Sequence, residues 1–417
     1  MTLGPISACQ ICGEVELRSA LFLGFLPAVN SMRPLGVPAD EEPWFPAELL
    51  VCPVCHLAQL GFAVDPAVLF PPGYPYTSGS TKVLRENFAD LYREAMERIG
   101  LASDDLVVDI GSNDGTLLQN FHEGGQRVVG IEPTDTGVIA RERGIATIKA
   151  YFDMDTVETV LREYGRPRLV TATNVFAHIP DVHAVVDAVE LLVGEDGHFV
   201  TESHYFGDLV ETLQYDTIYH EHLRYYSLTS MSALLERHDF CVTHVKRIPT
   251  HGGSIRVYAT KGDETPDPSV ERLLAEEQQH GLADESWIPD FRHRARQSKL
   301  DLLSLLRELK HDGARIYGIG APSRSSTLVN FVGLDDGIVD CVLEISTSKK
   351  LDKYLPGTAI PVLDERKLYE DQPEYALLLS WHIADELRDN LTRKGFRGGF
   401  VVPLPDPRVL AAEPVGA

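Results

Sequence analysis

The stretch Leu106-Val-Val-Asp-Ile-Gly-Ser-Asn-Asp-Gly-Thr116 sets the expected fold of this chain. An apolar, strand-like run leads into a loop that contains Gly111 and Gly115, and a helical pattern follows. Such a strand–loop–helix unit presents free backbone N–H groups at the start of the helix, where a nucleotide can bind. Further strand-like runs alternate with helical patterns, at Arg127–Glu132, Leu169–Thr173 and Phe199–Glu202. This rhythm predicts a parallel sheet covered by helices on both faces.

The glycine loop and the acidic residue beyond it indicate the cofactor. The loop has the form G-x-x-x-G rather than the G-x-G-x-x-G of a typical dinucleotide site. Glu132 ends the next strand, 23 positions after Asp109, and this spacing suits a carboxylate that binds two ribose hydroxyls. Together these features indicate S-adenosylmethionine (SAM); the alternative is a nucleotide-sized cleft with a different occupant. The candidate cofactor-binding residues are Asp109, Gly111, Asn113, Gly115, Glu132 and Asn174.

Two Cys-x-x-Cys pairs upstream of this loop predict a metal site. Cys9 and Cys12 form the first pair, and Cys52 and Cys55 form the second. Each pair can bring two thiolates onto one metal across a tight turn, and two pairs complete a tetrahedron for a structural Zn²⁺. The 39 residues between the pairs exceed the usual zinc-ribbon gap, and the alternative is four buried or free cysteines.

Composition excludes several classes of protein. The net charge is −24, which opposes a nucleic-acid partner, because such a partner requires a basic surface. No apolar run approaches the roughly 20 residues that cross a bilayer, and the N-terminus lacks the pattern of a secretion signal. A cytoplasmic protein without a membrane partner is therefore expected.

The 417 residues exceed what one hydrophobic core usually serves, and we predict an α/β protein of three domains. A zinc-binding cap spans residues 1–80, and a central Rossmann-like domain that binds SAM spans residues 81–265. Residues 266–417 carry a linker helix, expected from Val270 to Lys310, and a second Rossmann-like domain. The strand candidates of this last domain are Ile316–Ile319, Val339–Glu344, Ala376–Trp381 and Phe400–Val402.

Chemistry-bearing residues gather after the later strands of the central domain. Asn174-Val-Phe-Ala-His178 follows one strand, Glu202-Ser-His204-Tyr205 ends the next, and Tyr219-His-Glu-His222 comes shortly after. The carboxyl ends of parallel strands form the site of an open sheet, so these side chains are expected to share one edge. The alternative is an acidic and aromatic surface loop whose polar groups are all satisfied.

A second glycine-rich turn, Tyr317-Gly-Ile-Gly320-Ala-Pro-Ser-Arg324, opens the C-terminal domain. Glu344 ends the following strand, 24 positions beyond Gly320. The block is typical of a nucleotide-binding fold in which Arg324 could hold a phosphate. The alternative is a degenerate fold that only packs.

The chain resembles the sugar C-methyltransferases of antibiotic deoxysugar biosynthesis over nearly its whole length. The nearest types act in the formation of mycarose, noviose and tetronitrose, where they methylate C3 of nucleotide-linked 4-keto deoxysugars. The matching segments are the two Cys pairs, Tyr74-Pro-Tyr76-Thr-Ser-Gly79, Asp109 to Gly115, Asn174 to Pro180, Tyr219 to His222, His251-Gly-Gly253 and Gly318-Ile-Gly-Ala321. The resemblance implies a zinc domain, a central SAM-dependent Rossmann domain and a C-terminal Rossmann-like domain.

The resemblance also implies the site residues. It places Tyr76, His178, Tyr219, Glu221 and His222 at the catalytic centre, with Tyr74, Glu202, His251 and Arg324 as further candidate substrate contacts. The chain departs from the family pattern at three points: Arg324 stands where many members have lysine, Trp381-His382 where Trp-Asn is common, and Glu202-Ser-His204 where a carboxylate is usually followed by a Pro-Tyr step.

The expected reaction transfers the methyl group of SAM to C3 of a dTDP-linked 4-keto-(2,6-di)deoxy sugar. A ketone at C4 makes the C3 proton abstractable, because the charge spreads onto oxygen as an enolate. His222 is the expected base, and Tyr219, His178 or Tyr76 would donate a hydrogen bond to the enolate oxygen. Glu221 would orient the base or bind a sugar hydroxyl. The chain is expected to be a monomer or a homodimer.

Three other functions stay open. The C-terminal fold could bind NAD(P)H and reduce the 4-keto group, which would make the protein bifunctional. The His- and Tyr-rich loop would also serve an O-methyltransferase that acts on a small phenolic compound. A two-lobed nucleotide sensor without catalysis is the third possibility.

Overall fold

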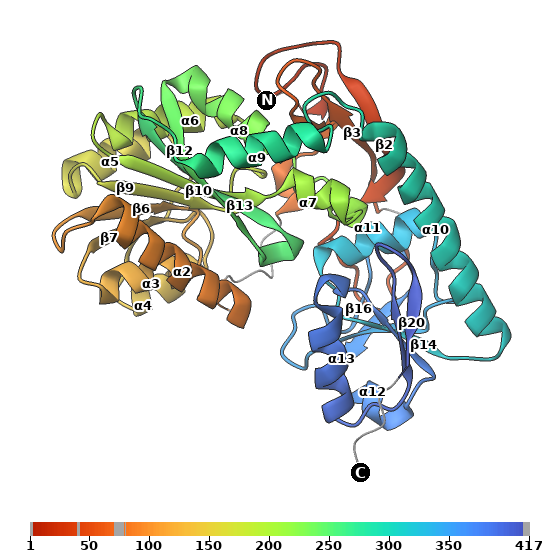
Figure 1. Ribbon diagram of the computed structural model, residues 1–417. Coiled ribbons are helices and arrows are strands. Elements are labelled where there is room, and N and C mark those ends of the chain that lie inside the picture. Colours follow the sequence, from red (N-terminus) through yellow and green to blue (C-terminus); the bar gives the residue numbers. More distant parts are fainter. Residues whose placement is uncertain (1–2, 40–41, 71–78, 80, 412–417) are drawn as a thin grey trace.

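The computed structural model describes residues 3–39, 42–70, 79 and 81–411, and it contains three larger sheets with separate positions along the chain (Figure 1). The N-terminal part holds a four-stranded antiparallel sheet in the order β11-β4-β3-β2 and a two-stranded ribbon, β1-β5. The strands are β1 (Gly4–Pro5), β2 (Arg18–Pro27), β3 (Trp44–Val51), β4 (Ala58–Leu60), β5 (Phe62–Ala63) and β11 (Arg224–Tyr225), and helix α1 spans Pro66–Leu69. Strand β11 belongs to the central part of the sequence, so two parts of the chain share this sheet.

The central sheet has seven strands in the order β12-β13-β10-β9-β6-β7-β8. Its first five strands in sequence are parallel, and β13 and β12 add an antiparallel pair at one edge. The strands are β6 (Leu106–Ile110), β7 (Arg127–Ile131), β8 (Ala146–Ile148), β9 (Leu169–Thr173), β10 (His198–His204), β12 (Phe240–Ile248) and β13 (Ser254–Lys261). After β6 the chain adds β7 and β8 on one side of this strand, and then adds β9 and β10 on its other side. Open α/β sheets bind ligands at such a switch point.

Helices cover both faces of the central sheet. Helices α2 and α3 pack with Val107 and Val200 on one face, and α5, α6 and α8 pack with Val108 and Phe199 on the other. The helices are α2 (Lys82–Ile99), α3 (Thr116–Glu123), α4 (Gly137–Glu142), α5 (Met154–Glu163), α6 (Val182–Val193), α7 (Phe206–Glu211) and α8 (Leu228–Leu235). Short 3₁₀ turns are η2 (Tyr215–Thr217), η3 (Glu236–His238) and η4 (Thr250–Gly252).

The C-terminal sheet also has seven strands, in the order β16-β17-β15-β14-β18-β19-β20. Strand β14 lies between β15 and β18 and is parallel to both, which gives this sheet a switch point of its own. The strands are β14 (Ile316–Ile319), β15 (Cys341–Glu344), β16 (Lys353–Tyr354), β17 (Pro361–Asp364), β18 (Tyr375–Leu378), β19 (Gly399–Val402) and β20 (Arg408–Leu410). The other elements are α9 (Pro268–Gln279), α10 (Ile288–His311), α11 (Ser323–Val332), α12 (Arg366–Asp371), η5 (Trp381–Ile383) and α13 (Ala384–Arg393).

The prediction of α/β domains built on parallel strands is confirmed, and local signals mark some boundaries accurately. The run at Leu106–Ile110 is buried on both faces, which is why it reads as continuous apolar sequence rather than alternation. Helix α2 begins where Thr81 Oγ1 accepts the Leu84 N–H at 3.4 Å, and it ends at Gly100, which has a left-handed φ of 68°.

The prediction of one linker helix from Val270 to Lys310 is wrong. The chain forms two helices, α9 and α10, separated by a turn at residues 280–287. Gly281 in this turn has a φ of 72°, a conformation that stops a right-handed helix, and Pro289 suits the first turn of α10. In Figure 1, α10 runs beside β2 and α11 and so connects the N-terminal and C-terminal parts.

The three parts pack on one another. One apolar core contains residues of β2, β3 and β4 together with α10, α11 and the C-terminal sheet. A second core joins the cysteine-bearing segment to the central sheet. Among the described helices, none combines the length and the apolar character that a membrane span requires.

Candidate active site

The four predicted cysteines form one cluster. Their sulfur atoms all lie within 4.8 Å of one another, with 3.4 Å between Cys9 and Cys55 and 3.4 Å between Cys12 and Cys52. In each Cys-x-x-Cys turn, two backbone N–H groups point at the first sulfur. Four convergent thiols with backbone donors are typical of a closed, structural Zn²⁺ site.

The glycine loop lies at the carboxyl end of β6, as predicted. Gly111 has a φ of 70°, and a Cβ at this position would lie 2.7 Å from Val175 Cγ2, so the close approach of two loops requires glycine here. Gly115 has a φ of 77° and is the N-cap residue of α3. The loop therefore brings backbone to the start of α3 without side chains in the way.

Glu132 and Asp109, two predicted cofactor-binding residues, lie in different places: one beside the glycine loop and one inside the sheet. Glu132 accepts hydrogen bonds from Asn113 N at 2.9 Å and Thr134 N at 2.8 Å, which hold its carboxylate beside the glycine loop. Asp109 lies inside the sheet, where burial raises the pKa of its carboxyl to about 7 and Thr171 donates to it at 2.7 Å. Glu132 thus borders the loop, and Asp109 supports the strand below it.

The predicted histidines and tyrosines meet above β9 and β10. The ring centroids of His178 and His222 are 5.0 Å apart, and those of Tyr219 and His222 are 4.3 Å apart. Burial raises the pKa of Tyr219, so this phenol keeps its proton and can donate a hydrogen bond. Tyr74 and Tyr76 lie outside the described residues, and their predicted roles stay predictions.

Backbone carbonyls determine the tautomers of both central histidines. His222 Nδ1 lies 3.1 Å from the carbonyl oxygen of Thr217, and His178 Nδ1 lies 2.7 Å from that of Glu221. Because a carbonyl only accepts, each Nδ1 carries the hydrogen, and the Nε2 of each neutral ring has a lone pair. Burial lowers the pKa of both rings, which favours this neutral form. A neutral His178 in this tautomer has no N–H left to donate to an enolate oxygen.

Glu221 lies where all three parts of the chain meet. Its Oε1 accepts a hydrogen bond from Asn30 Nδ2 at 2.8 Å, and the same Asn30 nitrogen lies 2.9 Å from Ser323 Oγ. Asn30 follows β2, and Ser323 starts α11. No sequence motif marked Asn30, because an isolated loop asparagine carries no pattern.

Three more histidines line the interface between the central and C-terminal parts. Burial lowers the pKa of His251 and, together with the nearby charge of Arg324, brings it to about 4. The same two causes lower the pKa of His204 and of His382 to about 3. Of these, the family pattern pointed to His251, whereas His204 and His382 are departures from it.

Arg324 occupies a different environment from the predicted phosphate site. Its Nε and Nη2 each lie 2.8 Å from the carboxylate of Asp216, which also accepts from Trp381 Nε1 at 2.7 Å. Nη1 lies 3.1 Å from His382 Nδ1. Its charge is thus paired within the protein and joins the C-terminal part to η2, and a phosphate-binding role stays a prediction.

The Glu202 side chain points into the protein interior, between β10, β13 and α2. Its side chain is fully buried, and its carboxylate oxygens bind Arg256 Nε at 2.7 Å and Asn87 Nδ2 at 2.8 Å. These contacts tie β10 to β13 and α2, so the geometry favours a supporting role, and contact with substrate stays a prediction.

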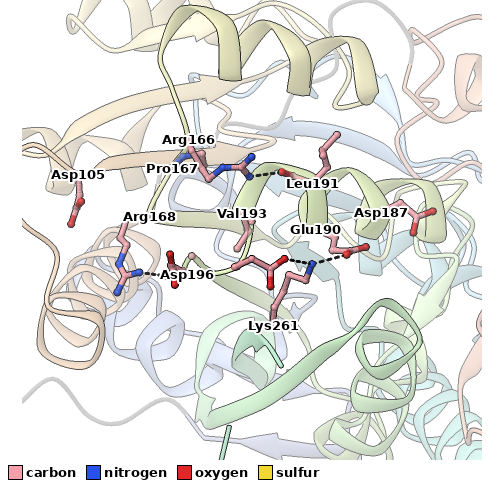
Figure 2. A pocket seen from close by; sticks show the side chains of 13 residues that line it. Asp105, Arg166, Pro167, Arg168, Asp187, Glu190, Leu191, Val193, Asp196 and Lys261 are labelled. Carbon is pink, nitrogen blue, oxygen red and sulfur yellow. Dashed lines mark hydrogen bonds and ion pairs between the residues drawn. The ribbon is translucent and has the colours of Figure 1, made fainter. Parts of the chain in front are cut away.

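A small cavity of about 30 Å³ lies beside His222 at the carboxyl edge of β9 and β10. Its lining residues are Asn174, Ala177, His178, Ser203, His204, His222, Arg224, Tyr225 and Tyr226. A larger hollow of about 650 Å³ lies at the opposite edge of the sheet, before β9 and β10 (Figure 2). Its cations are used within the protein, as with Lys261, which binds Glu190 at 2.9 Å. The convergence of candidate residues favours the smaller cavity as the site.

Family models match three successive parts of the chain. A zinc binding domain matches residues 9–70, a methyltransferase domain matches residues 84–245, and a C-methyltransferase C-terminal domain matches residues 249–405. The chain is 36% identical to C-methyltransferase NovU from Streptomyces niveus over 413 residues, which cover 98% of each chain.

Solved structures match only parts of the chain. The magnesium protoporphyrin IX methyltransferase of Synechocystis with bound SAM is 12% identical, with a TM-score of 0.33 over 43% of this chain and 79% of that one. The PH0226 protein of Pyrococcus horikoshii is 15% identical, with a TM-score of 0.36 over 48% of this chain and 97% of that one. These scores are low, and no conclusion rests on them.

The zinc domain, the glycine loop and the domain matches define a methyltransferase, which confirms the predicted class of enzyme. The chain belongs to the C-methyltransferase family that includes NovU. The predictions of the zinc-binding domain and of the family are confirmed.

Substitution of one cluster cysteine should remove the metal. Cys52→Ser leaves three thiolates and an incomplete tetrahedron, so we expect about one zinc ion per chain in the wild type and far less in the variant. Elemental analysis of the purified proteins measures this. Cys241→Ser is the control, because Cys241 lies on β12, outside the cluster. Zinc retained in full by Cys52→Ser would contradict the assignment.

Proposed function

We propose that this enzyme transfers the methyl group of SAM to C3 of a dTDP-linked 4-keto-deoxysugar, through an enolate formed by His222. The observation that carries the proposal is the tautomer of His222. Its Nδ1–H is held by the Thr217 carbonyl, so the lone pair of Nε2 is left beside a buried cavity. Methylation at carbon requires a carbon nucleophile, and a base beside a ketone generates one.

The glycine loop and Glu132 support SAM as the methyl donor. Gly111 has intermediate exposure and lies in the loop that leads to the start of α3, where a nucleotide can approach closely. Oε1 of Glu132 accepts from both the backbone N–H and the hydroxyl of Thr134. Oε2 accepts the Asn113 N–H, and its second lone pair can accept a ribose hydroxyl. When bound, SAM would supply an electrophilic methyl group on a sulfonium, and the sulfur would keep the electron pair of the broken sulfur–carbon bond as a neutral thioether.

The residues of this chain would act on the sugar as follows. His222 Nε2 takes the C3 proton, and the electron pair of that C–H bond spreads onto the C4 oxygen. The buried, protonated Tyr219 stacks beside His222 and can hold a hydroxyl or the C4 oxygen of the ring. Glu221, fixed by Asn30, can bind a sugar hydroxyl or orient the substrate. Exclusion of water by the three packed parts strengthens each of these interactions.

The position of the second switch point supports a nucleotide-linked substrate. The turns that follow β14 and β18 carry Arg324 and Trp381, and both contact Asp216 of the central part. The carboxyl edge of the C-terminal sheet therefore lies against η2, whose residue Thr217 contacts His222. A sugar bound at His222 could extend its nucleoside diphosphate toward this edge.

Glu132→Ala should weaken SAM binding, because the ribose hydroxyls lose their acceptor. A lost hydrogen bond to a charged group costs about 1.5–3 kcal/mol, so we expect an increase in Kd of roughly 10- to 150-fold. Isothermal titration calorimetry measures the affinity. Glu123→Ala, at the exposed end of α3, is the control. Unchanged affinity in Glu132→Ala would rule out the ribose assignment.

His222→Ala should lower kcat by at least about 100-fold, because a general base contributes this much, while the affinity for SAM stays the same. Mass spectrometry of the methylated sugar gives the rate, and calorimetry gives the affinity. His280→Ala, at the C-terminal end of α9, is the control for loss of a histidine elsewhere. Turnover at the wild-type rate in His222→Ala would remove this residue as the base.

The acid limb of the pH profile should lie below pH 6.5. Burial lowers the pKa of His222 beneath its ordinary value of 6.5, so the ring stays neutral and able to take a proton as the pH falls through that value. Activity is then lost only when the pH reaches the lowered pKa. The logarithm of kcat/KM measured against pH tests this, with circular dichroism as the control for unfolding. An acid limb at or above pH 6.5 would contradict the buried, neutral base.

A further inference from the structure

Ser203 presents a buried hydroxyl that has no hydrogen-bond partner among the described residues. The residue lies on β10, is 3% exposed and lines the cavity beside His222. An unsatisfied buried hydroxyl is costly and uncommon in a native protein, and it calls for an unseen water or ligand.

A second hydroxyl in the same cavity has an unused hydrogen. Tyr226 is fully buried, and its Oη accepts the Arg224 Nε–H at 3.0 Å. No bond in the described part of the chain uses this hydroxyl as a donor. Arg224 is itself held by the carbonyls of Phe176 and Ile179, so the position of the phenol is fixed. Burial raises the pKa of Tyr226, which keeps its proton in place.

The histidines that line the cavity offer hydrogen-bond acceptors instead of donors. In the tautomers set by the backbone, His178 and His222 each have an Nε2 lone pair and no N–H to spare. Among the described residues, the cavity lining thus offers the Ser203 and Tyr226 hydroxyls as donors, the Nε2 atoms of His178 and His222 as acceptors, and the side-chain amide of Asn174, for which no hydrogen bond is formed. Its volume of about 30 Å³ suits a single oxygen atom, since one water requires roughly 10–15 Å³ by the same measure.

We propose that this cavity is the oxyanion site of the reaction and that the Ser203 hydroxyl donates a hydrogen bond to the C4 oxygen of the substrate, with Tyr226 as a second donor. A water would occupy the cavity in the free enzyme. This inference rests on the proposed function and assigns the donors that the neutral His178 cannot supply. Ser203 is therefore a catalytic residue in this proposal.

The step balances without any further reactant. The C3 proton passes to His222 Nε2, and the electron pair of the C–H bond forms the C3–C4 double bond of the enolate. The C4 oxygen gains negative charge and accepts the two hydroxyl hydrogen bonds, while Ser203 and Tyr226 keep their protons. When C3 bonds to the methyl group, the C4 carbonyl re-forms and these hydrogen bonds weaken. The donors thus stabilise the charged state selectively.

The test compares Ser203→Ala with Ser298→Ala. Both serines are buried, but Ser298 lies on α10, away from the cavity. We expect Ser203→Ala to lower kcat for methylation about 100-fold with little change in KM, whereas Ser298→Ala keeps wild-type turnover. Melting temperature and zinc content verify that both variants fold.

A second measurement separates enolate formation from methyl transfer. With S-adenosylhomocysteine bound, the wild type in D₂O should exchange the C3 hydrogen of a dTDP-4-keto-deoxysugar, followed by NMR, and Ser203→Ala should slow this exchange by the same factor as methylation. If neither the wild type nor Ser203→Ala exchanges the C3 hydrogen while the wild type still methylates the sugar, the comparison of kcat for methylation decides the test. Ser203→Ala with kcat within about threefold of the wild type, or with unchanged exchange, would overturn the inference.

Failure of the proposed function has a different signature. If the wild type forms no carbon-methylated sugar from any dTDP-4-keto-deoxysugar, the reaction itself is wrong, and the oxyanion site falls with it. If the wild type methylates carbon and Ser203→Ala does so equally fast, the reaction stands and only the role of Ser203 is rejected.

Discussion

The buried carboxylate of Asp216 is the interaction on which the geometry of the cleft depends. It accepts two hydrogen bonds from Arg324 and one from Trp381, and both partners belong to the C-terminal part. The next residue, Thr217, holds Nδ1 of His222 through its carbonyl. A buried charge without partners is strongly destabilising, so η2 keeps this position only while α11 and η5 stay docked. The orientation of the His222 ring therefore depends on contacts made by the C-terminal part.

The same ion pair shapes the electrostatics of the cleft. Arg324 lies close enough to His204, His251 and His382 to lower the pKa of each, in addition to the effect of burial. Neutral imidazoles need fewer compensating charges than imidazolium ions in a dry interface. The cleft can therefore hold several histidines next to a guanidinium without strong repulsion.

Patterns that repeat along the chain predicted much of the fold. The apolar runs at Leu106–Ile110, Leu169–Thr173 and Ile316–Ile319 became strands with the expected bounds, because strands buried on both faces leave an unbroken apolar signal. The prediction of one linker helix was wrong at the turn that contains Gly281. The apolar residues on both sides of this turn follow the same helical spacing, so the sequence pattern does not reveal the turn. The four cysteines were predictable because two Cys-x-x-Cys turns specify a metal centre almost by themselves.

The site was predictable as a list of residues but not as an arrangement. Sequence placed His178 and His222 at one edge of the sheet, yet their tautomers depend on carbonyls that only the folded chain brings near. Arg324 looked like a phosphate ligand because its partner, Asp216, lies 108 positions away. The hydroxyl of Ser203, which has no partner in the described part of the chain, gives no sequence signal, since a serine in a strand is common.

Strand β11 gives the fold a property that neither domain would have alone. It begins two residues after His222 and pairs with β4, which follows directly on the second cysteine pair. Leu60 N also donates a hydrogen bond to Leu223 O. Backbone hydrogen bonds therefore connect the segment after Cys55 with the segment after His222. Occupancy of the thiol cluster and occupancy of the cleft are then thermodynamically linked, and linkage is reciprocal. A ligand that fastens β11 at the His222 end should therefore strengthen metal binding at the four thiols.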